Sequence, residues 1–181
     1  MAHFEKTIKG DYAFRGRIIS LRVDEIELEN GKTATREVVE HPGGVCVLPL
    51  GADDTVTLVR QFRYPYKEEL LELPAGKRSP GEDPLECGKR ELTEETGLVA
   101  AHYQSLGQMY PSPGYVDEII YLYLATGLTE AEQCLDEDEF LDVCPLPLAE
   151  AVQKVLSGEI KDAKTQVLLL KAYAMRQNGQ I

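Results

Sequence analysis

Three glutamates in one short segment carry the clearest chemistry of this sequence. The segment RELTEE at residues 90–95 places Glu91, Glu94 and Glu95 at positions i, i+3 and i+4. On a helix these positions share one face, and like charges so close together are destabilising. Hard cations such as Mg²⁺ bind carboxylate oxygens, so the spacing indicates a cation-binding face. A solvated acidic face would show the same pattern. Arg90 lies four residues before Glu94 and either holds that carboxylate in place or forms a surface ion pair.

The helix that must carry these glutamates has clear start and stop signals. Asp83 is a good N-cap, Pro84 suits the first helical position, and Glu86 completes a capping box. Gly97 is of the type that ends a helix in the left-handed conformation. The sequence therefore predicts a helix over residues 84–96.

Strands and helices alternate along the rest of the chain. Residues 12–40 are strand-like with a hairpin turn at 29–32, and the HPGG segment at 41–44 interrupts the pattern. Further strands are expected at residues 45–50, 55–61, 69–73, 103–109, 118–125 and 140–145, and helices at 146–157 and 162–176. This order predicts an α/β layered domain at residues 44–181, preceded by a small antiparallel β extension at residues 1–43.

Composition excludes several classes of protein. The 181 residues include 19 Lys and Arg against 31 Asp and Glu, a formal charge of −12, which disfavours binding to a nucleic-acid backbone. The chain lacks an apolar run of about 20 residues for a membrane span. The first ten residues lack the features of a signal peptide. Four widely spaced cysteines predict free thiols rather than a zinc site or a disulfide framework, so we expect a cytoplasmic protein.

The glutamates belong to a longer pattern that identifies a family. The chain fits G-x5-E-x7-R-E-U-x-E-E-x-G-U, in which U is a bulky aliphatic residue, with every fixed position satisfied. These positions are Gly76, Glu82, Arg90, Glu91, Leu92, Glu94, Glu95, Gly97 and Leu98. The pattern resembles the Nudix box. The resemblance implies an α/β/α sandwich in which the box forms a loop, a helix and a loop, and hydrolysis of a nucleoside diphosphate linked to another group, with divalent cations.

Three further segments resemble the ADP-ribose pyrophosphatase branch of that family. They are LELPAG at residues 71–76, RQFR at residues 60–63, and SPG at residues 112–114 followed by DE at 117–118. The resemblance implies Mg²⁺-dependent cleavage of ADP-ribose to AMP and ribose 5-phosphate, with Mn²⁺ as a second candidate cation. Two alternatives stay open, which are the same reaction on another nucleotide sugar such as GDP-mannose, and a non-catalytic module that binds ADP-ribose.

The resemblance also assigns roles in the reaction. Glu91 and Glu95 would be the main metal ligands together with the backbone carbonyl of Ala75. Glu94 would be a ligand or a neighbour of the ligands, locked by Arg90, and Glu82 would support the cluster. The general base would lie on the acidic loop at residues 134–140. Glu137 is the first candidate for this base, and Glu139 is the alternative.

Substrate contacts are implied for four further residues. Arg36 and Arg63 resemble phosphate- or ribose-binding arginines, for which the planar guanidinium is suited. Glu72 resembles an acceptor on the substrate side, and Glu118 resembles an acceptor for ribose hydroxyls. Each of the four could instead be an ordinary surface or strand residue. The extension is too short to bury a core of its own, and in this branch such extensions pair across a dimer, so we expect a homodimer.

Overall fold

The structure is a computed structural model that describes residues 3–137 and 139–181. By contacts the chain divides into two units. The N-terminal unit comprises the described residues up to Gly43 together with Tyr110–Ile119. The main unit comprises Gly44–Met109 and Ile120–Ile181. The expected division into residues 1–43 and 44–181 stays a prediction, and it did not anticipate that Tyr110–Ile119 contacts the N-terminal strands. No helix in the described residues is long and apolar enough to cross a membrane.

The N-terminal unit is an antiparallel sheet in the order β1-β2-β3. Its strands are β1 (Lys6–Arg15), β2 (Ser20–Glu27) and β3 (Thr33–Glu40). The hairpin between β2 and β3 is confirmed, since the amide of Leu28 donates to the carbonyl of Lys32. The expected strand start at residue 12 was wrong, because β1 begins at Lys6. Ile8, Tyr12 and Phe14 lie at alternate positions of β1, but every residue of this strand is exposed.

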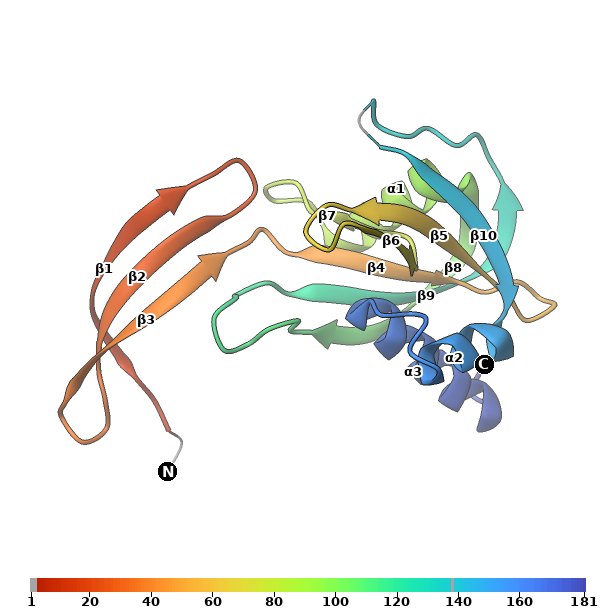
Figure 1. Cartoon of the computed structure of the whole chain (residues 1–181). Helices are drawn as coiled ribbons and strands as arrows, with labels where there is room; N and C mark the ends of the chain where they lie inside the picture. Colours follow the sequence, from red (N-terminus) through yellow and green to blue (C-terminus); the bar gives the residue numbers. More distant parts are fainter. Residues whose placement is uncertain (1–2, 138) are drawn as a thin grey trace. The chain divides into compact units, whose positions relative to one another are not determined.

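In the residues that the structure describes, the main unit contains two sheets and three helices (Figure 1). One sheet has the order β7-β4-β9-β8 and the other the order β10-β5-β6. The strands β4 and β9 pair in parallel, and the other pairs are antiparallel. The strand bounds are β4 (Gly44–Pro49), β5 (Thr55–Arg63), β6 (Glu68–Glu72), β7 (Ala75–Lys77), β8 (Leu98–Met109), β9 (Ile120–Glu130) and β10 (Leu141–Pro147). The helices are α1 (Pro84–Thr96), α2 (Leu148–Leu156) and α3 (Ala163–Gln177).

The central strand β4 is buried on both faces, which gives the unit its layers. Val45 and Val47 pack against Cys87 and Leu92 of α1 in a smaller core. Cys46 and Leu48 point the other way, into a larger core that also includes side chains of α2, α3 and β5. Residues that alternate along a strand face opposite sides of the sheet, so this apolar run covers both cores. The layers form the expected α/β/α sandwich (Figure 1).

Most of the predicted elements are present, with some differences at their ends. The bounds of α1 are those predicted from its capping residues. The short strand β7 was not predicted, and β8 begins at Leu98 rather than at residue 103. β9 begins at Ile120, so Glu118 lies before this strand rather than at its start. β7 is only three residues long and contains a glycine, so its strand character comes from pairing with β4 rather than from its own composition.

Candidate active site

Helix α1 is fixed at both ends and presents two of its glutamates inward. The Asp83 side chain accepts hydrogen bonds from the amides of Leu85 and Glu86, and Gly97 ends the helix with φ 67°. The apolar side of the helix packs on β4. This orientation buries Glu91 and Glu95, whose residues are 7% and 2% exposed. The capping signals of the sequence therefore set the position of both carboxylates.

The segment leading into the box lies directly against these carboxylates. The backbone N–H of Ala75 donates to Oε2 of Glu95 at 3.1 Å. A Cβ atom placed on Gly76 would come within 1.9–2.3 Å of the carboxylate atoms of Glu91, so a side chain there would displace this carboxylate. Glycine at this position thus has a steric reason, which is that the Glu91 carboxylate occupies the space of the missing side chain.

The environment of both carboxylates favours their protonated forms. Burial raises the pKa of Glu95 to about 8. The N–H of Ala75 opposes this shift, and the charges of Glu91 and Glu139 add to it. Burial likewise raises the pKa of Glu91 to about 7, against the ion pair that Arg90 makes with it at 2.8 Å. Two carboxylates with raised pKa values beside each other are the pattern expected where a cation normally binds.

Arg90 connects the other glutamates of the box. Its Nη1 donates to Glu94 at 2.8 Å, and its Nε donates to Glu82 at 3.1 Å. The hydrogen bonds from Arg90 and from the amide of Ser79 lower the pKa of Glu82 to about 2. The structure therefore brings together the box residues that the sequence singled out, with Glu82 and Glu94 held by Arg90.

The donor set suits a cation that is only partly coordinated by the protein. Among the described residues, no three Asp, Glu, His or Cys side chains converge closely enough to hold a metal ion by themselves. Mg²⁺ is usually held by one or two carboxylates plus water and substrate phosphates rather than by a cage of protein ligands. Glu91 and Glu95 are two such carboxylates, and in the described part of the chain Lys and Arg form no ion pair with Glu95. These residues therefore fit Mg²⁺.

The start of the acidic loop at residues 134–140 lies against the C-terminal end of α1. The amide of Cys134 donates to the carbonyl of Glu94 at 3.1 Å, and Nε2 of Gln133 donates to the carbonyl of Glu95 at 2.6 Å. Further along the loop, Glu139 is half-buried. Burial is the main cause of the raised pKa values of Glu91 and Glu95, and the charge of Glu139 is a smaller cause for both. Glu137, the first candidate from the sequence, is exposed.

Arg63, which is half-buried, and Glu72, which is buried, bind each other rather than forming two separate substrate contacts. Nε and Nη2 of Arg63 donate to the two carboxylate oxygens of Glu72 at 2.6 and 2.7 Å. The side chain of Glu72 is 2% exposed. Its carboxylate also accepts from Lys164, which in turn pairs with Asp162 at 2.9 Å. No local pattern in the sequence points to Lys164, because its partner Glu72 lies 92 residues earlier in the chain.

Arg36 and Glu118 lie in the N-terminal unit. Arg36, on β3, forms an ion pair with Glu5. Oε1 of Glu118 lies 3.1 Å from Nδ1 of His41, and the side chain of the neighbouring Asp117 accepts from the amide of His41 at 2.9 Å. Arg36 is therefore paired and exposed at the surface of its sheet, whereas Glu118 is fixed at the end of β3.

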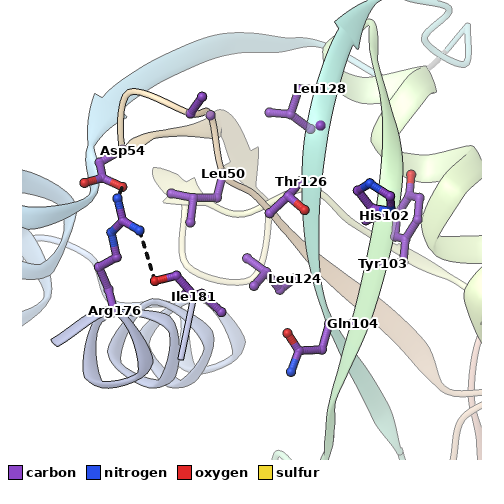
Figure 2. Close-up of a pocket in the computed structure, with 13 residues that line it drawn as sticks. Leu50, Asp54, His102, Tyr103, Gln104, Leu124, Thr126, Leu128, Arg176 and Ile181 are labelled. Atoms are coloured by element: carbon purple, nitrogen blue, oxygen red, sulfur yellow. Dashed lines mark hydrogen bonds and ion pairs between the residues drawn. The ribbon is translucent and has the colours of Figure 1, made fainter. Parts of the chain in front are cut away.

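The main unit also has a cavity of about 560 Å³ that contains none of the predicted site residues (Figure 2). Its lining includes Leu50, Leu124 and Thr126, and Asp54 pairs with Arg176 at 2.7 Å at its edge. Arg176 also donates to the carbonyl of Ile181 at 3.0 Å. Because this arginine is already paired, the cavity offers less to a diphosphate than the box does.

Comparisons with known proteins agree with the geometry of the box. The chain matches the NUDIX domain over residues 24–173 and the nucleoside diphosphate sugar hydrolase N-terminal domain over residues 5–39. It is 45% identical over 165 residues to the methanol dehydrogenase activator of Bacillus methanolicus, which covers 90% of this chain and 89% of that protein. It is 44% identical over 163 residues to the ADP-ribose pyrophosphatase of Bacillus subtilis (strain 168), with 89% and 88% covered.

A GDP-mannose pyrophosphatase of Yersinia enterocolitica is 38% identical over 144 residues, covering 74% of this chain and 75% of that protein. The fold is similar to the crystal structure of an ADP compounds hydrolase, with a TM-score of 0.82 at 22% identity, covering 98% of this chain and 97% of that one. The matched domain spans most of the chain and includes the complete box. The chain therefore belongs to the Nudix family and is a Nudix hydrolase of the ADP-ribose pyrophosphatase branch.

Proposed function

We propose that this chain hydrolyses ADP-ribose to AMP and ribose 5-phosphate with Mg²⁺, or alternatively Mn²⁺, as the cofactor. Hydrolysis of the pyrophosphate bond of a nucleotide sugar follows from its family. The choice of ADP-ribose is supported by the ADP-ribose pyrophosphatase at 44% identity. The observation that carries the proposed chemistry is the buried pair Glu91 and Glu95, whose carboxylates lie side by side beside Ala75 and Gly76.

Each residue of the box has a definite task in this proposal. Glu91 and Glu95 provide carboxylate oxygens for the cation, and the carbonyl of Ala75 provides a third oxygen. Arg90 keeps Glu94 beside them. The cation, when bound, neutralises the diphosphate and lowers the pKa of the attacking water. The protein supplies fixed positions, because the ligands lie on a capped helix and on a paired strand.

Glu139 is the general base in this proposal. A base must come within about 3 Å of the water from which it takes the proton. The charge of Glu139 acts on both proposed ligands, and the start of its loop is anchored to α1, which supports this assignment. A loop that closes over the substrate would complete this approach.

The N-terminal unit supplies the partner and further contacts in the proposal. Its sheet exposes large apolar side chains, including Ile8, Tyr12 and Phe14. A second copy of the chain would cover them in a homodimer. Arg36 would reach a phosphate by exchanging its pairing with Glu5, and Glu118 would accept from ribose hydroxyls. The free thiols of all four cysteines support a cytoplasmic location.

Cleavage of GDP-mannose is the second candidate, and the relative at 38% identity favours it. We expect a panel of nucleotide sugars with Mg²⁺ to give the highest kcat/KM for ADP-ribose. In ¹⁸O-labelled water, mass spectrometry should find one labelled oxygen in only one of the two products, AMP or ribose 5-phosphate. A panel led by GDP-mannose would contradict the substrate assignment. Absence of cleavage in the whole panel would contradict the function.

The two candidate bases can be separated by substitution. We expect Glu139→Gln to reduce kcat for ADP-ribose about 100-fold or more, the usual contribution of a general base. Glu137→Gln should reduce it by much less, because this side chain is exposed. Steady-state kinetics at neutral pH would measure both variants. The opposite order of effects would return the role to Glu137.

The steric role of Gly76 predicts a variant that folds but works poorly. In Gly76→Ala the new methyl group occupies the position of the Glu91 carboxylate, and the flexible end of that side chain can move away. We therefore expect a kcat that is lower by at least tenfold, with a melting temperature within a few degrees of the parent. Kinetics and thermal unfolding of the same preparation would test this. A fully active variant would show that Glu91 need not stay beside Gly76.

The raised pKa values predict how the stability of the metal-free protein depends on pH. Glu91 and Glu95 bind protons more tightly in the folded than in the unfolded state, so their contribution is complete below about pH 4.5 and is lost as pH rises through 7 and 8. A tenfold change in proton affinity is worth about 1.4 kcal/mol. We expect Glu95→Gln to raise the unfolding free energy at pH 8 by on the order of 2 kcal/mol and to lower kcat by orders of magnitude.

Urea unfolding in EDTA between pH 5 and pH 8 would measure this dependence. Glu86→Gln is the matched control, because Glu86 lies on the same helix but is exposed and paired with Lys89. In the control, the unfolding free energy should change with pH as it does in the parent chain. Addition of Mg²⁺ should stabilise the parent more at pH 8 than at pH 5. A parent chain whose stability rises steadily up to pH 8 in EDTA would contradict the proposed environment of the two glutamates.

A further inference from the structure

A buried lysine outside the Nudix box belongs to the same network as Arg63. The side chain of Lys164 is 14% exposed and lies in the first turn of α3. Its ammonium group contacts the carboxylates of Glu72 and Asp162. Burial disfavours the charged lysine, but the charges of Asp162 and Glu72 outweigh burial and keep the pKa of Lys164 above its usual value. The lysine is therefore held charged in the interior.

The four side chains form a neutral group with two positive and two negative charges. Glu72 stands between Arg63 and Lys164, and its Oε2 accepts from both. Although burial acts in the opposite direction, these two cations hold the pKa of Glu72 below its usual value. Asp162 completes the group and also caps α3, since its side chain accepts from the amide of Thr165 at 2.9 Å. The ammonium group thus shares Oε2 of Glu72 with Arg63 and holds that oxygen in place.

Both oxygens of that carboxylate set the direction of Arg63. The guanidinium uses Nε and Nη2 for Glu72, and within the described residues Nη1 takes part in no hydrogen bond or ion pair. A guanidinium bound through two parallel hydrogen bonds has a fixed plane. The charge of Arg63 also reaches the catalytic cluster, because it opposes the burial that raises the pKa of Glu95. Nη1 therefore remains for an anionic ligand close to that cluster.

We propose that Lys164 is a positioning residue that, through Glu72, holds Arg63 in the orientation that binds a phosphate oxygen of the substrate. The proposal rests on the proposed function for the identity of that substrate. Without Lys164, the carboxylate of Glu72 loses one of its two cations and is held by Arg63 alone, so its position is no longer fixed. The guanidinium then follows Glu72 instead of presenting Nη1 to the ligand.

A double-mutant cycle tests this role. We expect Lys164→Met, which keeps the length and the apolar stem of the side chain, to lower kcat/KM for ADP-ribose at least tenfold, chiefly by raising KM. In an Arg63→Gln background the same substitution should change kcat/KM less than twofold, because the residue that it positions is already absent. Equal effects in the two backgrounds would show that Lys164 acts independently of Arg63 and would overturn the proposal.

The matched control is Lys161→Met. Lys161 lies three residues before Lys164. It pairs at 2.7 Å with Glu68, which lies on β6 like Glu72, but the side chains of Lys161 and Glu68 are 56% and 41% exposed. The control should keep the kcat/KM of the parent chain. A loss equal to that of Lys164→Met would reveal a general effect of surface charge and would contradict the proposal. If Lys164→Met does not fold, Lys164→Gln, which removes the positive charge that acts on Glu72, takes its place in the cycle with the same expected effects.

A binding measurement separates this proposal from the proposed function. Calorimetry with ADP should show a dissociation constant at least fivefold higher for Lys164→Met than for the parent chain, and no such difference in the Arg63→Gln background. If the parent binds ADP but cleaves no nucleotide sugar, the function fails and this comparison still decides the role of Lys164. Equal ADP affinity of the parent and the Lys164 variant, or no binding by either protein, would overturn the proposal.

Discussion

The repulsion between two carboxylates that are buried side by side is the constraint on which the site depends. Glu91 and Glu95 lie on one face of α1, and burial raises the pKa of both. Such an arrangement costs stability unless a cation or protons compensate it. The fold holds the arrangement in place through other interactions, which are the caps of α1, its apolar contact with β4 and the N–H of Ala75.

Strand β4 links the stability of the main unit to the geometry of the site. Its two faces serve two cores, so one short apolar segment positions α1 on one side and the α2–α3 layer on the other. The same strand pairs with β7, which contains Ala75 and Gly76. Helix α1 and strand β7, which meet at the glutamates, are therefore both positioned by contact with one buried strand, β4. A scaffold that is packed on both faces in this way holds the side chains of the site in fixed positions.

The sequence predicted those parts of the site whose signals are local. The Gly76-to-Leu98 pattern and the caps of α1 lie within one short segment, and the structure places these residues as expected. Residues that meet across a long stretch of the chain show no local pattern in the sequence. Lys164 meets Glu72 across 92 residues, and Tyr110–Ile119 joins the N-terminal unit through the bridge from Val39 to Val116. β1 was placed too late in the chain because Ile8 is the one large apolar residue among its first six, residues 6–11, which is too few to indicate a strand.

The main unit thus contains two groups of charged side chains that differ in their net charge. The quartet around Glu72 is neutral, and each of its members has a partner of opposite sign. The pair Glu91 and Glu95 has a local excess of negative charge that Arg90 relieves only at Glu91. A balanced group fixes side chains in place, whereas an unbalanced one gains stability from an added cation. Arg63 is the member of the balanced group that reaches toward the unbalanced one. Its cationic end and a bound metal ion would therefore both offset the negative charge of the same diphosphate.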